Sequence, residues 1–138
     1  MKKQAATLLI LMLAVLTGLV SAQTRTMITA QVPFDYYANG KMMPAGECTI
    51  IIDGDGQARL WIASGNERMV ALPNSTESLS PSEGTNLLFH EYQGRYFLAG
   101  VERRGESRGY ELPASKLEIE LRAQNVVEKD VTLVASLR

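Results

Sequence analysis

Apolar and polar residues alternate along much of the chain, with the two-residue period of β-strands that bury one face. The first clear example is Met27–Phe34. Its predicted buried face carries Ile28, Ala30, Val32 and Phe34. Turn-forming pairs such as Asn39-Gly40 and Gln93-Gly94 interrupt the alternation, and Gly and Asn tolerate the positive φ angles that tight turns need. The pattern therefore predicts a chain of short strands.

Four further segments have strand length and a high content of β-branched or aromatic residues. They are Glu47–Ile52, Gln57–Ala63, Arg68–Leu72 and Val131–Ser136. In the second of them, Leu60 and Ile62 fall on one face and Trp61 falls on the other. Alternation therefore places Trp61 on the opposite side of this strand from Leu60 and Ile62.

The strongest hairpin signal joins Leu87–Tyr92 to Arg95–Val101 through the two-residue turn Gln93-Gly94. This turn predicts that Tyr92 lies opposite Arg95, Phe89 opposite Leu98 and Leu87 opposite Gly100. The expected core face carries Leu87, Phe89, Tyr96 and Leu98. The other face is also apolar, so we expect both faces of this hairpin to be covered.

Two segments depart from the strand pattern. Asn74–Thr85 has no period and is rich in Ser, Thr and Glu, which predicts a solvent-exposed loop. Residues 114–124 are ambiguous between helix and strand, and the Ser115-to-Glu118 capping-box spacing favours a short helix. The fold expected for the chain is mainly all-β, a small antiparallel barrel or sandwich of about seven strands with one short helix near the C-terminus.

The N-terminus is expected to be a signal peptide over residues 1–22. Lys2 and Lys3 precede the 16 uncharged residues Ala5–Val20, and a small-residue exit ends at Ala22. Cleavage would make Gln23 the first residue of the mature protein. The apolar stretch is shorter than the ~20 residues that a membrane-spanning helix needs. We therefore predict a single β-rich domain over 23–138, secreted or periplasmic, with no stable transmembrane span after processing.

The composition argues against several classes of partner and functional site. The formal net charge of −1 does not favour a nucleic-acid partner, and the chain has one Cys and one His. No phosphate-binding loop, paired-cysteine metal site or nucleophile elbow is present in the sequence. From these patterns we expect no cofactor and no metal site, and we assign no catalytic residue. Cys48 is expected to be a buried, inert thiol, with a disulfide between chains as the alternative.

The candidate ligand-binding residues are aromatic or imidazole side chains. They are Trp61, His90, Tyr92 and Tyr96. Packing within or between strands explains each of them without a ligand. His90 is interpreted as a half-buried structural imidazole, because its predicted cross-strand neighbour is Phe97.

Several segments occur together in an order that resembles a known family. They are Val32-Pro33-Phe34, Met43–Thr49 (MPAGECT), Leu87–Tyr92 (LLFHEY), Arg95–Leu98 (RYFL) and Glu111–Lys116 (ELPASK). Their combination resembles a family of small exported β-rich proteins abundant in acidobacterial genomes. The resemblance implies export, a β-rich fold and a charged helix after Glu111-Leu112-Pro113, but no assigned activity.

The sequence leaves two functional hypotheses. The first is a non-enzymatic β-domain that binds a partner, either a protein or another envelope component, or that has a structural role in the envelope. The alternative is a small hydrolase or isomerase that uses scattered carboxylates. Two or three carboxylates gathered with His90 in one pocket would favour the enzyme, and a closed, side-chain-filled interior would favour the binding domain.

Overall fold

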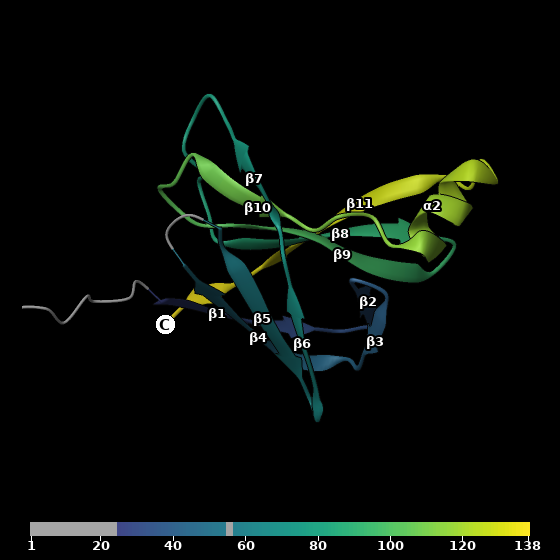
Figure 1. Cartoon of the computed structure of the whole chain (residues 1–138), viewed down its shortest axis with the longest axis horizontal. Helices are drawn as coiled ribbons and strands as arrows, with labels where there is room; N and C mark the ends of the chain where they lie inside the picture. Colours follow the sequence, from purple (N-terminus) through teal and green to yellow (C-terminus); the bar gives the residue numbers. More distant parts are fainter. Residues whose placement is uncertain (1–24, 55–56) are drawn as a thin grey trace, which may run out of the picture.

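Two β-sheets form a sandwich-like fold in the computed structural model, which describes residues 25–54 and 57–138 (Figure 1). The predicted signal peptide over 1–22 and its cleavage site between Ala22 and Gln23 lie outside the described residues. The expected mainly-β fold is confirmed. The two sheets do not close into a barrel, so the sandwich is the better description.

The first sheet has five strands in the order β12-β1-β4-β5-β6. The strands are β1 (Arg25–Val32), β4 (Gly46–Asp53), β5 (Arg59–Ser64), β6 (Glu67–Ala71) and β12 (Ser136–Leu137). Every neighbouring pair is antiparallel. Since side chains alternate along each strand, one face of this sheet is buried and the other faces solvent.

The second sheet has seven strands and is built around the predicted hairpin. Its main path runs through β11 (Glu128–Val134), β8 (Asn86–Tyr92), β9 (Arg95–Glu102), β10 (Arg108–Glu111) and β7 (Asn74–Glu77). The short strands β2 (Tyr36–Ala38) and β3 (Lys41–Met43) extend it, and β2 pairs in parallel with β9. Both residues of the Gln93-Gly94 turn have positive φ angles, as the hairpin prediction requires.

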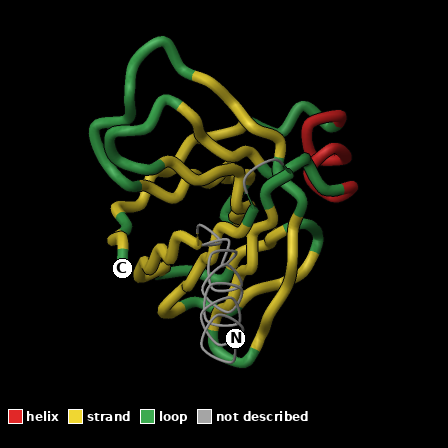
Figure 2. The backbone as a smooth tube through the Cα atoms, turned by 60° about the vertical axis from the view of Figure 1, so that its left-hand side comes forward, coloured by secondary structure: helices red, strands yellow, loops and turns green. Residues whose placement is uncertain are grey.

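The predicted short helix is confirmed as α2 (Lys116–Ala123). Ser115 caps it, because its hydroxyl accepts a hydrogen bond from the backbone N–H of Glu118 at 3.3 Å. Leu121 packs with Tyr92 and Phe97 in a small apolar cluster. The helix lies at one end of the molecule and covers the outer face of the β8–β9 hairpin there (Figures 1 and 2).

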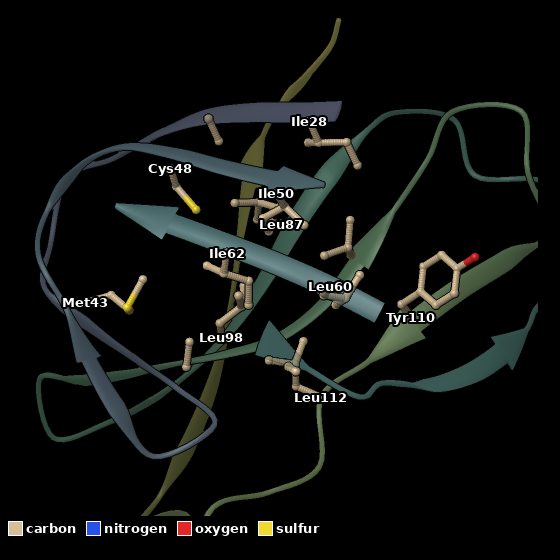
Figure 3. Packing of buried hydrophobic residues seen from close by; sticks show 14 of the residues in the cluster. Ile28, Met43, Cys48, Ile50, Leu60, Ile62, Leu87, Leu98, Tyr110 and Leu112 are labelled. Carbon is tan, nitrogen blue, oxygen red and sulfur yellow. The ribbon is translucent and has the colours of Figure 1, made fainter. Parts of the chain in front are cut away.

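The main core fills the space between the two sheets (Figure 3). The first sheet contributes side chains such as Ile28, Ile50 and Ile62, and the second contributes Leu87 and Phe89. Phe89 makes edge-to-face contacts with Tyr36 and Phe34. Packed side chains from both sheets therefore fill the interior between them.

Three details differ from the sequence-based expectations. The described chain contains twelve strands, because short pairings such as β7 form within segments that were expected to be turns or loops. The final predicted strand begins earlier, at Glu128, and its continuation β12 joins the other sheet. Leu87 lies opposite Val101 and Leu88 lies opposite Gly100, since a bulge between Leu88 and Phe89 shifts the register by one residue.

Cys48 lies in the core with its sulfur against the hydroxyl of Tyr36. The hydroxyl donates to Sγ at 3.1 Å, and both side chains are fully buried. Burial raises the pKa of the Cys48 thiol, which keeps it in its unreactive form. The position supports the buried-thiol interpretation, because a sulfur enclosed in the core is not placed for a disulfide between chains.

The burial of the Tyr36 phenol predicts that the protein loses stability at alkaline pH. Burial, and then the neighbouring Cys48, raise the pKa of its phenol far above the ordinary value of about 10. Above pH 10 the unfolded chain releases this proton and the folded chain does not, so the free energy of unfolding falls as pH rises. Urea unfolding at pH 9 and pH 11 should show a smaller loss in Tyr36→Phe than in the wild type, by up to about 1.4 kcal/mol. Equal losses in the two proteins would contradict this assignment.

Candidate functional site

The outer face of the five-stranded sheet carries a row of apolar side chains, three of them exposed and one half-buried. Strand register places Met27 beside Ile51, Ile51 beside Trp61, and Trp61 beside Val70, across β1, β4, β5 and β6. Met27, Trp61 and Val70 are 36%, 45% and 40% exposed. We call these four residues the Trp61 row. Solvent-facing strand positions are ordinarily polar, so a continuous apolar row across four strands marks a surface suited to binding.

Arginines flank the Trp61 row. A shallow hollow of about 640 Å³ lies over the row, and its lining includes Trp61, Arg25 and Arg68. Arg25 and Arg59 both lie in register with Asp53, and Arg25 pairs with it at 3.6 Å. Among the described residues, Arg59 and Arg68 form no ion pair. The surface therefore combines an apolar centre with a rim of positive charge.

A second group of polar side chains gathers on the outer face of the other sheet, beside α2. Strand β8 contributes His90 and Tyr92, and the adjacent strand β11 contributes Asp130 and Glu128 at the register-paired positions. Helix α2 contributes Glu118 and Arg122, which are one turn apart. We call these six residues the His90 cluster.

Glu118 holds one side of the His90 ring. Its Oε1 lies 2.7 Å from His90 Nδ1, and only 7% of the Glu118 side chain is exposed. A carboxylate can only accept a hydrogen bond, so the short contact places a proton on Nδ1, which donates a hydrogen bond to Glu118. Arg122 Nη2 also lies 3.4 Å from Nδ1, and in this tautomer that longer contact is not a hydrogen bond. The other ring nitrogen, Nε2, faces Glu128 Oε1 at 3.5 Å and Asp130 Oδ1 at 3.8 Å.

The hydroxyl of Tyr92 joins the remaining members of the cluster. It donates toward Glu128 Oε2 at 2.6 Å and Glu118 Oε1 at 3.1 Å, and it accepts from Arg122 Nε at 2.8 Å. Burial, followed by the hydrogen bond to Glu128, raises the pKa of Tyr92. The Tyr92 hydrogen bond, together with the nearby His90 and Arg122, lowers the pKa of Glu128. Glu128 is therefore held as a carboxylate.

The cluster contains a set of groups that could hold a metal ion. One nitrogen of His90 and one oxygen each of Glu128 and Asp130 all lie within 4.8 Å of one another. A neighbouring groove of about 340 Å³ includes His90 and Asp130 in its lining, with Leu88 and Thr132 beyond them. A small ligand in this groove can reach both residues.

The four residues singled out from the sequence lie in three separate places. Trp61 is on the outer face of the first sheet, whereas His90 and Tyr92 belong to the His90 cluster. Tyr96 is stacked on Phe34 at a centroid distance of 3.7 Å beside the main core. The structure does not bring these side chains together into one aromatic platform.

Sequence reasoning missed the partners of both Trp61 and His90. The carboxylate of Glu118 is 28 residues from His90 along the chain, and no local pattern connects them. The usable signals were indirect: the i,i+4 spacing of Glu118 and Arg122 on a helix, and the alternation of Glu128 and Asp130 on a strand. Only the packing of α2 and β11 against β8 brings these groups together.

Within residues 25–54 and 57–138, none of the helices has the length and apolar character needed to cross a bilayer. Comparison with known proteins found no matching family model, no matching curated protein and no matching solved structure.

Proposed function

We propose that this protein is an exported, non-enzymatic β-domain that binds a partner protein through the Trp61 row. The expectation of export comes from the signal-peptide pattern of residues 1–22 and from the resemblance to exported β-rich proteins. The observation that carries the binding role is the continuous apolar row of Met27, Ile51, Trp61 and Val70, of which Ile51 is half-buried and the other three are exposed, on a sheet whose opposite face packs in the core.

The chemistry of this surface favours a protein partner. Its centre combines one aromatic side chain with aliphatic ones, and Trp and Arg are the side chains that most often dominate binding energy at protein interfaces. Arg59 and Arg68, which form no ion pair within the part of the chain that the structure describes, favour carboxylates around the partner's contact patch. We therefore infer that the partner presents an apolar knob with acidic residues around it.

Site-specific photo-crosslinking in the producing cells tests this proposal. A photoreactive phenylalanine derivative at position 61 is expected to capture one discrete protein. Adding Arg68→Glu to that variant should reduce the yield at least tenfold, because it places a negative charge beside an acidic rim.

Position 119 provides a matched control. Ile119 is an exposed apolar residue on α2, far from the Trp61 row in the fold (Figure 1). The same crosslinker there should not capture the protein seen from position 61. Capture of identical proteins from both positions, or a yield unaffected by Arg68→Glu, would contradict the proposed interface. A product of twice the protein's own mass would show self-association and would also contradict it.

A small hydrolase or isomerase is the second candidate, and one observation favours it. Three carboxylates, from Glu118, Glu128 and Asp130, surround His90, and a groove adjoins them. The packed interior between the sheets favours the binding domain instead. Turnover of a hydrolase or isomerase substrate that is lost in Asp130→Asn and kept in Trp61→Ala would support the enzyme.

A further inference from the structure

We propose that His90, Glu128 and Asp130 bind a divalent transition-metal ion, with Zn²⁺ as the best match. The proposal concerns the sheet opposite the Trp61 row and does not depend on the partner-binding function. It rests on the orientation of one imidazole, the spacing of three ligand atoms, the local charge and the access to the site.

The orientation of His90 suits a metal ligand. Glu118 fixes the proton on Nδ1, so in the neutral ring Nε2 presents a lone pair toward Glu128 and Asp130. Three acceptor atoms then point toward one another, which is unfavourable unless a cation lies between them or Nε2 takes up a proton, and a metal ion competes with that proton for the same lone pair. Histidines that bind metals characteristically donate their other N–H to a carboxylate, as His90 does to Glu118.

The spacing of the ligand atoms is close to that of a tetrahedral metal site. The separations of 3.5 and 3.8 Å from Nε2 are longer than the 2.7–3.2 Å of ordinary N–H···O hydrogen bonds. In a tetrahedral site with metal–ligand bonds of about 2.0–2.2 Å, neighbouring ligand atoms lie roughly 3.3–3.6 Å apart. One separation lies within this range, one lies slightly above it, and the third, between the Glu128 and Asp130 oxygens, is within 4.8 Å. Side-chain adjustment brings the three atoms to tetrahedral spacing, which the 84% exposure of Asp130 permits.

The charge of the His90 cluster favours a divalent cation. The cluster contains the carboxyl groups of Glu118, Glu128 and Asp130 and the guanidinium of Arg122, so its formal charge is 1 − 3 = −2 with a neutral imidazole. Arg122 contacts Glu128 through Oε2, and the atom facing His90 is Oε1. A divalent cation would neutralise the cluster without displacing Arg122.

The ligand set indicates which ions the site prefers, and the groove gives an ion access to the site from solvent. An imidazole with two carboxylates suits Zn²⁺ and similar first-row ions, whereas Mg²⁺ and Ca²⁺ prefer oxygen ligands alone. Three protein ligands leave a fourth tetrahedral position for water or another small ligand. Since His90 and Asp130 line the groove, that position can be reached from solvent.

Titration calorimetry on the purified, chelator-treated protein tests the site. Zn²⁺ should bind with one-to-one stoichiometry and raise the unfolding temperature, and Mg²⁺ at the same concentration should do neither. Co²⁺ should give the intense visible absorption of a tetrahedral complex. Asp130→Asn is the sharpest variant, because this exposed side chain does not support the fold, and it should weaken Zn²⁺ affinity at least tenfold. Glu118→Gln should weaken it by about 10–100-fold through the orientation of His90.

Glu91→Gln is the matched control. Glu91 adjoins His90 on β8 but points to the opposite face, and it lies in register with Lys129 on β11. This variant should keep wild-type affinity for Zn²⁺. Absence of one-to-one Zn²⁺ binding by the wild type, or equal affinities in Asp130→Asn and Glu91→Gln, would overturn the proposal. These measurements do not depend on whether a partner protein binds the Trp61 row. Failure of one proposal can therefore be distinguished from failure of the other.

Discussion

The Leu87→Ala variant is expected to lose about 2–5 kcal/mol of its free energy of unfolding. Leu87 is fully buried on β8, a strand paired on both sides, and it packs in the core between the two sheets (Figure 3). Alanine removes most of the side chain and leaves a cavity that a sheet paired on both sides cannot easily close. Because a domain of this size is stable by only about 5–15 kcal/mol, such a loss is a large fraction of the total.

Urea unfolding measures this loss, and Leu79→Ala controls for the substitution itself. Leu79 is fully exposed between β7 and β8, so the same change there should alter the free energy of unfolding by less than about 0.5 kcal/mol. Similar losses in the two variants would contradict the placement of Leu87 in the core.

The Gly100→Ala variant is expected to lose about 1–3 kcal/mol for a different reason. A Cβ atom at Gly100 would lie 2.8 Å from the backbone carbonyl oxygen of Tyr110, which is closer than such atoms approach. Since the obstacle is backbone, β10 must move away from β9 and its pairing at Glu111 must weaken. Hydrogen exchange should therefore accelerate in β10 as the unfolding midpoint falls.

Gly84→Ala is the matched control for Gly100→Ala. At Gly84 the nearest atoms belong to the side chain of Asn86, at 3.5 Å, an ordinary contact distance. Alanine there should leave stability unchanged or raise it slightly, by restricting the unfolded chain. If the two variants were equally stable, the close approach of β9 and β10 at Gly100 would be refuted.

The local features of the fold could be predicted because their causes are local. Alternation on Met27–Phe34 identified the buried side of β1, and the Gln93-Gly94 turn identified the β8–β9 hairpin. The bulge between Leu88 and Phe89 could not be anticipated. It depends on how β9 meets β8 on one side and β10 on the other, and single-strand periodicity carries no information about that.

The candidate site, like the fold, has features that a local sequence pattern predicts and features that depend on contacts between distant segments. The placement of Trp61 on the opposite face from Leu60 and Ile62 follows from the pattern of β5 alone, but that this face is exposed to solvent does not. The other members of the Trp61 row depend on the register between strands, which the sequence did not specify. The surroundings of His90 depend on tertiary packing, because α2 and β11 bring their carboxylates from distant parts of the sequence.

The passage of the C-terminal segment from one sheet to the other has a consequence for folding kinetics. Val134 ends β11 beside β8, and two residues later Ser136 begins β12 beside β1. The register pair Ile28 and Leu137 therefore closes a loop that encompasses almost all of the described chain. The entropic cost of closing so large a loop slows its formation. We therefore expect the hairpins to form early in folding and the pairing of β1 with β12 to form last.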